Sequence, residues 1–97
     1  MIYHIATAKD WNLHLAQTTY VPEAFAKEGF IHCSEAWQLP GVIERFYKGA
    51  EGLIVVEIAP SKLTSKLVYE KAADVEDWFP HVYGPIHTDA INKITAI

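Results

Sequence analysis

One short segment, residues 29–34, constrains the fold of this chain more than any other. It reads Gly-Phe-Ile-His-Cys-Ser. The glycine suits the position just after a helix, where a left-handed backbone costs little. The residues after it are typical of a strand, whose side chains alternate between two faces, so Phe30, His32 and Ser34 would share one face. A strand with histidine and serine on one face either satisfies a buried hydrogen-bond network or builds a site.

The length of the chain allows one small domain, residues 1–97, with its own hydrophobic core. The net charge is -4 and the eight basic residues are scattered, so we expect no salt-driven binding to nucleic acid. The longest apolar run, residues 53–56, is too short to span a membrane, and the amino terminus lacks the features of a signal peptide. The single cysteine cannot form an internal disulfide, so we expect a cytoplasmic, reducing location.

The order of the expected elements predicts a small α+β domain with helices early and strands late. Thr7 and Asp10 have the spacing of a capping box, which predicts a helix from Thr7 to about Gln17. The other expected elements are helices at residues 22–28 and 40–48, the latter in a stretch capped by Ser34, and strands at residues 2–6, 30–33, 52–59, 67–71 and 90–97. Residues 72–88 hold no period, so we expect a loop there. This order favours a mainly antiparallel sheet.

His32 and Ser34 are the first candidates for a functional site. On the functional interpretation they line a cleft and exchange hydrogen bonds with a ligand. On the structural interpretation His32 is tied to a backbone carbonyl and Ser34 only caps a helix. Cys33 falls on the opposite strand face, so it does not form a nucleophilic pair with His32, and a buried apolar role is favoured.

Two further candidates lie on other predicted strands. A lone histidine among apolar residues, as His4 is, is more often a satisfied core residue. His4 gains functional interest if the first two strands are neighbours and both histidines face the same side. Glu70 lies in an otherwise apolar strand, where a carboxylate can act as a base or anchor a hydroxyl. The alternative is a solvated edge position or a salt bridge.

His81 and Tyr83 lie in a segment bracketed by Pro80 and Pro85, which we expect to be a stiff loop. A rigid loop that presents histidine and tyrosine is well suited to ligand binding. The alternative is that the aromatic side chains of this loop plug the end of the core. The histidines and the cysteine show none of the spacings typical of zinc sites, so we expect no metal.

Several segments together resemble a known family. They are Tyr3-His4-Ile5, residues 28–34, Tyr69-Glu70 and residues 79–85. On these motifs the whole chain resembles the small, mostly bacterial family catalogued as domain of unknown function 952 (DUF952). Its members resemble the ADP-ribosyltransferase superfamily. The resemblance therefore implies a split, mainly antiparallel α+β domain with a cleft between two small sheets.

The resemblance also implies roles for particular residues. In that superfamily a histidine on the first strand holds a ribose hydroxyl of NAD, and His4 matches that position. Glu70 is the counterpart of a glutamate that orients the second ribose. His32 and Ser34 resemble a histidine-x-serine strand that helps to hold phosphate. NAD or a related nucleotide is therefore the implied cofactor or ligand, although apolar residues follow His4 where many transferases have glycine and a hydroxyl residue.

Our leading hypothesis is a small enzyme, or enzyme-like protein, whose cleft binds a nucleotide or ribosyl-phosphate ligand. The hypothesis assigns catalytic roles to Glu70 and His32, and ligand-binding roles to His4, Ser34, His81 and Tyr83. The first alternative is a binding module without turnover. The second is a protein-interaction domain anchored by the aromatic residues at positions 78–83.

Overall fold

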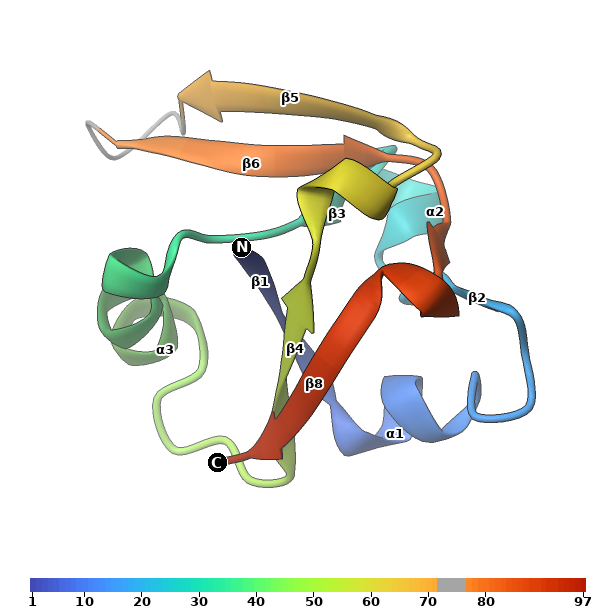
Figure 1. The fold of residues 1–97 in the computed structure, drawn as a ribbon. Coiled ribbons are helices and arrows are strands. Elements are labelled where there is room, and N and C mark those ends of the chain that lie inside the picture. The colour runs from blue at the N-terminus through green and yellow to red at the C-terminus, as the bar shows by residue number, and fades with distance from the viewer. Residues whose placement is uncertain (72–76) are drawn as a thin grey trace.

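The computed structural model describes residues 1–71 and 77–97, which form small antiparallel sheets with short helices around them (Figure 1). The strands are β1 (Ile2–Thr7), β2 (Thr19–Tyr20), β3 (Ile31–His32), β4 (Leu53–Ile58), β5 (Lys66–Lys71), β6 (Trp78–Tyr83), β7 (Ile86–His87) and β8 (Ile91–Ala96). The α-helices are α1 (Ala8–Asn12), α2 (Phe25–Glu28) and α3 (Leu39–Phe46). The predicted α+β class with mainly antiparallel pairing is confirmed. No helix in the described ranges is long and apolar enough to cross a membrane.

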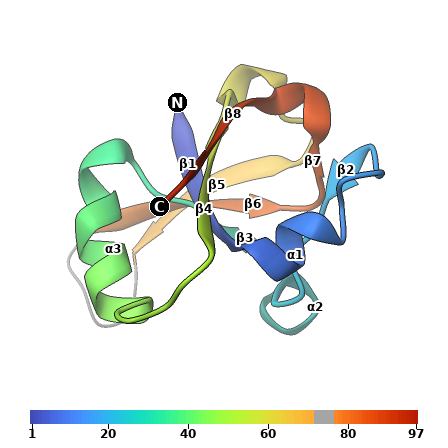
Figure 2. The same cartoon turned by 90° about the horizontal axis from the view of Figure 1, so that it is seen from below.

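Two three-stranded sheets make up most of the molecule. One has the strand order β1-β4-β8 and the other β3-β6-β5. Figure 1 shows β5 and β6 lying across one end of the first sheet, and Figure 2 gives the view turned by 90°. The core joins the two sheets through side chains such as Ile2 and Val56 from the first and Ile31 and Val82 from the second. Each such fully buried side chain stabilises the fold by about 1.5–3 kcal/mol.

Local signals in the sequence set where the first helices begin and end. Thr7 Oγ1 accepts a hydrogen bond from the Asp10 N–H at 3.1 Å, so Thr7 is the N-cap that the sequence predicted. α1 ends at Asn12, well before the predicted end, because the backbone bonds from His14 onward reach only three residues back. Gly29 ends α2 with φ 83°, the left-handed conformation expected of it.

The prediction of a loop over residues 72–88 is wrong for the part that the structure describes. Residues 78–83 form β6, the central strand of its sheet, while residues 72–76 lie outside the described residues. The proline in this strand hid the pattern, because proline lacks an N–H and is disfavoured in central strands. Cys33 N–H donates to the Pro80 carbonyl at 3.0 Å. In an antiparallel strand the N–H and carbonyl of one residue point to the same neighbour, so the N–H that Pro80 lacks would point toward β3. β3 has already ended at His32, before this position.

Ser34 does not cap a helix, contrary to the prediction. Its N–H donates to the Tyr3 carbonyl at 2.7 Å, and its carbonyl accepts from the Tyr3 N–H at 2.8 Å. Glu35 is the N-cap of the short 3-10 helix that follows, with Gln38 completing a capping box. The backbone at Ser34 therefore ties the end of β3 to β1 and connects the two sheets.

Gly84 stands where a side chain would collide with a neighbour. A Cβ atom there would lie 2.4 Å from Ser65 Oγ and 2.9 Å from Ser65 Cβ. We expect Gly84→Ala to lower the free energy of unfolding by about 1–3 kcal/mol, because the neighbouring chain must move. Gly41→Ala in α3 is the matched control, since nothing lies within 4 Å of its Cβ position, and it should be neutral or slightly stabilising. Urea unfolding measures both variants, and equal stabilities would contradict the expectation.

Candidate functional site

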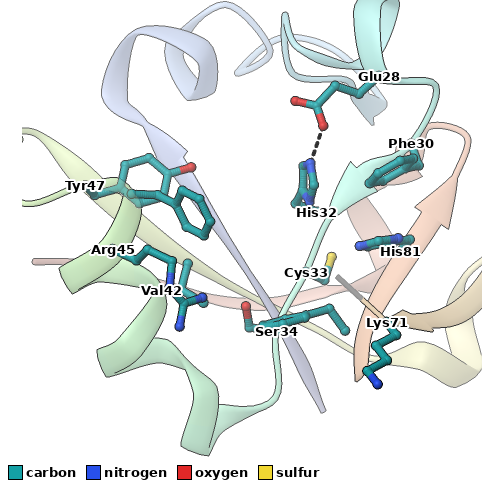
Figure 3. Close-up of a pocket in the computed structure, with 12 residues that line it drawn as sticks. Glu28, Phe30, His32, Cys33, Ser34, Val42, Arg45, Tyr47, Lys71 and His81 are labelled. Atoms are coloured by element: carbon teal, nitrogen blue, oxygen red, sulfur yellow. Dashed lines mark hydrogen bonds and ion pairs between the residues drawn. The ribbon is translucent and has the colours of Figure 1, made fainter. Parts of the chain in front are cut away.

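A pocket of about 640 Å³ lies between the β3-β6-β5 sheet and α3. Figure 3 shows His32 and His81 on one side of it and Arg45 and Tyr47 on the other. Ser34 also lines the pocket. A volume of this size is within the range of small-molecule sites, roughly 300–1,000 Å³.

The two segments that the sequence singled out meet in this pocket. His32 of β3 stands directly opposite His81 of β6 in the antiparallel register, so both side chains leave the same face of the sheet. Their ring centroids lie 5.2 Å apart, with the rings nearly perpendicular. Phe30 packs against both rings and stacks on His81 at 4.0 Å. The opposite face carries Ile31 into the core.

A carboxylate from α2 holds His32. The His32 Nε2 atom is hydrogen-bonded to the Glu28 carboxylate, the pair drawn with a dashed line in Figure 3. Gly29 lies between the helix and the strand, and its left-handed turn brings the two side chains together. The His32 side chain remains 57 % exposed, so the imidazole is open to solvent and to a ligand. Sequence reasoning missed Glu28, although its spacing of four residues from His32 was a usable signal.

A second carboxylate holds His81. Glu70 of β5 accepts from His81 Nδ1 at 2.8 Å and from the Tyr83 hydroxyl at 2.5 Å. The hydrogen bond from Tyr83, and then the one from His81, lower the pKa of Glu70 below its ordinary value. A donating Nδ1 leaves Nε2 as the proton acceptor in the neutral ring. The structure therefore brings His81, Glu70 and Tyr83 together, but Glu70 and Tyr83 stand behind His81 and do not line the pocket.

The structure does not bring His4 into the pocket. Its Nδ1 lies 2.6 Å from the His32 carbonyl oxygen and its Nε2 lies 2.8 Å from the Tyr20 hydroxyl. The residue is buried, and burial lowers its pKa to about 4, against the raising effect of the backbone hydrogen bond to His32. His4 is thus a core residue whose ring nitrogens both have partners, as the structural interpretation expected. Its bond to the His32 carbonyl supports the backbone of β3.

The wall contributed by α3 was not foreseen. Val42, Arg45 and Phe46 of this helix line the pocket, and Tyr47 follows directly after it. Arg45 also lies over the Phe46 ring at 5.5 Å. Helical spacing could have grouped Val42, Arg45 and Phe46, but nothing in the sequence indicated which surface this helix would face.

Two other groups bear on the chemistry of the pocket. Lys71, at the end of β5, lines it and adds a positive charge to that of Arg45. Cys33 is buried, and burial raises the pKa of its thiol, so it is poorly suited to act as a nucleophile. Within residues 1–71 and 77–97, no group of three or more His, Cys, Asp and Glu side chains is arranged to hold a metal ion.

A family model described as a protein of unknown function, DUF952, matches residues 5–94. The chain belongs to this family. No curated protein matches it. The crystal structure of protein CC0527 from Caulobacter crescentus, a structural genomics target, is similar with a TM-score of 0.85 and 23 % identity, over 97 % of this chain and 82 % of that one.

The solution structure of CC0527 gives the same picture, with a TM-score of 0.81 and 23 % identity over 99 % of this chain and 83 % of that one. At this identity the likeness shows the fold alone. The match supports the arrangement of strands and helices in this DUF952 member. The chemistry of the pocket depends on its own residues.

The buried His4 of this DUF952 member makes its stability depend on pH. The folded-state pKa, about 4, lies below the ordinary value of 6.5, so the unfolded chain binds more protons between these values. Stability is therefore lost as the pH falls through this window, by about 3 kcal/mol. Urea unfolding at pH 7 and pH 4.5 should show a smaller loss in His4→Gln than in the wild type. His87→Gln, at an exposed residue, is the control, and an unchanged loss in His4→Gln would contradict the assignment.

The hydroxyl of Tyr83 should hold the Glu70 carboxyl ionised. We expect Tyr83→Phe to raise the pKa of Glu70 toward its ordinary value, because the first cause of the lowered pKa is removed. Tyr69→Phe is the matched control, since the Tyr69 hydroxyl donates to Glu35 and not to Glu70. A carboxyl-carbon NMR titration reports the Glu70 pKa directly. The same value in Tyr83→Phe and the wild type would show that this hydrogen bond is not formed in solution.

Proposed function

We propose that the pocket between α3 and the β3-β6-β5 sheet binds a nucleotide or ribosyl-phosphate ligand. The observation that carries the proposal is the pair of imidazoles, His32 and His81, on one wall, facing Arg45 on the other. A phosphate group between these walls would receive hydrogen bonds from several donors at once. Bonds of this kind between ionised groups are among the strongest in proteins.

The charge of the pocket supports an anionic ligand. The whole chain is acidic, yet Arg45 and Lys71 both line this one cavity. Arginine offers a planar fork of donors that matches two phosphate oxygens, and lysine acts as a point charge. Ser34 supplies a hydroxyl, as the histidine-x-serine resemblance suggested. Glu28 also lines the pocket, but its carboxylate is paired with His32.

Aromatic side chains in the pocket support a ligand that carries a base or another ring. Phe79 and Tyr47 line it from opposite walls. Tyr83, to which the sequence assigned a ligand-binding role, is instead held to Glu70 by its hydroxyl and lies outside the pocket lining. In this proposal Phe79 and Tyr47 therefore stack on the ring of the ligand.

A relationship to ADP-ribosyltransferases remains part of the proposal, and two small antiparallel sheets are consistent with it. The arrangement favours phosphate recognition over NAD turnover of that type. Both ring nitrogens of His4, the expected ribose contact, already have partners. Glu70, the expected second contact, is engaged by His81 and Tyr83.

A protein-interaction role is the second candidate, and exposed tryptophans favour it. Trp37 is 68 % exposed and Trp78 is 59 % exposed. Gln38, which follows Trp37, donates to the Trp78 carbonyl at 3.0 Å, so the two tryptophans belong to the same end of the molecule. Large exposed aromatic side chains often anchor partners.

Ligand titrations followed by proton NMR of the histidine rings test the proposal. With ADP-ribose or ribose 5-phosphate at millimolar concentration, we expect saturable shifts of the His32 and His81 signals and none of His87, which is exposed outside the pocket. Arg45→Ala should weaken binding roughly 10-fold or more, because a charge-assisted hydrogen bond is lost. Arg45→Lys should retain part of the affinity. Absence of any shift would contradict the proposal, and a concentration-dependent dimer without ligand binding would favour the interaction role.

A further inference from the structure

We propose that His32 and His81 form an acid–base pair that hydrolyses a phosphodiester bound in this pocket. The inference rests on the proposed phosphate-binding function and adds a reaction to it. It assigns proton transfer to the two histidines and positioning to the carboxylates behind them, Glu28 and Glu70. Water is the second reactant.

The arrangement of the two histidines goes beyond what anion binding requires. A site that only binds phosphate gains most from permanent cations, and this pocket already has Arg45 and Lys71. Imidazole differs from these groups because it both takes and gives a proton near neutral pH. Two imidazoles with ring centroids 5.2 Å apart can serve the two ends of one substrate, one as base and the other as acid.

Each histidine is held through one ring nitrogen only. Glu28 engages Nε2 of His32, and Glu70 engages Nδ1 of His81. Across the described residues, no hydrogen bond engages the second ring nitrogen of either histidine. A carboxylate bonded to one nitrogen fixes the tautomer and the ring orientation and stabilises the imidazolium, as in catalytic triads. The second nitrogen is then the one that exchanges a proton with substrate.

The Glu28–His32 pair is poorly explained as a device for stability. Glu28 and His32 are well exposed, at 39 % and 57 % of their side chains, and exposed pairs contribute little to folding. The strands of this sheet are already joined by their backbone ladder and by the core contacts of Ile31 and Val82. The Glu28 and His32 side chains instead line the pocket. A role in the chemistry of the pocket accounts for their placement better.

The proposed step balances without a metal or redox partner. The neutral histidine takes a proton from water, and the water oxygen forms a bond to phosphorus. The bond between phosphorus and the leaving oxygen breaks, and its electron pair stays on that oxygen. The protonated histidine gives its proton to the leaving oxygen, so the products are a phosphate monoester and an alcohol. Proton exchange with solvent restores both rings.

Other charged and titratable groups face the pair and bear on its pH dependence. They are Glu28 of α2, Cys33 after β3, Arg45 of α3, Tyr47 after α3, Glu70 and Lys71 of β5, and the Tyr83 hydroxyl of β6. The two carboxylates hold the imidazole rings, while Arg45 and Lys71 bring positive charge that attracts the phosphate.

Two synthetic diesters of thymidine 5′-phosphate test the inference. The p-nitrophenyl ester has a leaving group that departs without a proton, whereas the methyl ester needs one. We expect a bell-shaped pH profile of kcat/KM. His32→Ala and His81→Gln should each lower kcat/KM for the methyl ester by about 100-fold or more. One of these variants, the one that lacks the acid, should be impaired much less with the p-nitrophenyl ester.

A variant of Glu70 tests whether this carboxylate positions His81 for proton transfer or only stabilises the fold. Glu70→Gln keeps a side chain of the same shape but removes the anionic partner of His81, and we expect it to lower kcat and to change the pH profile of kcat/KM. His87→Ala, at an exposed histidine outside the pocket, is the control and should keep full activity. Thermal unfolding of each variant reports whether the fold is retained.

The outcomes separate the inference from the function on which it rests. The acid–base inference would be overturned if neither ester is hydrolysed while ADP-ribose still shifts the histidine NMR signals. The binding function would then stand. Neither hydrolysis nor shifts would overturn both. Equal loss with both esters in both histidine variants would overturn the division into base and acid.

Discussion

The pairing of β3 with β6 is the interaction on which the rest of this structure depends. Two residues of β3 enter the ladder, yet they set both the core and the candidate site. Ile31 lies opposite Val82, and both side chains are fully buried. His32 lies opposite His81, and both point to the other face, toward the pocket. Because side chains alternate along a strand, a slip of one residue would exchange these faces and destroy core and pocket together.

The hydrogen bonds of the ring nitrogens separate the histidines into two kinds. His4 is enclosed by β3 and Tyr20, has partners at both ring nitrogens, and is held neutral by desolvation. His32 and His81 stand at a cavity, each with a carboxylate on one nitrogen only. Histidine therefore has a structural role at position 4, whereas at positions 32 and 81 one ring nitrogen is left to contact a ligand. The three are connected, since His4 bonds the backbone carbonyl of His32 and so supports the strand that presents it.

The pocket also depends on a contact between distant parts of the chain. Its histidine wall comes from residues 30–34 and 79–81, while Arg45 and Tyr47 come from α3 and the residue after it. The chain as a whole is acidic, but the fold collects two of its few cations around one cavity. The likeness to CC0527 establishes the fold of this DUF952 member, while the chemistry of the pocket depends on these side chains.

The sequence by itself determined the elements that depend on neighbouring residues. The Thr7 cap, the left-handed Gly29, the strands β1, β4 and β8, and the alternation that separates His32 from Ile31 are all local, and the motifs were sufficient to recognise the family. Tertiary structure alone decided that residues 78–83 form a central strand. The lack of an N–H at Pro80 is tolerated because Pro80 lies beside the end of β3. Tertiary structure also decided that His4 is enclosed, that Glu70 holds His81, and that α3 closes the pocket. These outcomes depend on which surfaces meet, and that is set by long-range packing rather than by the local preferences that a sequence pattern records.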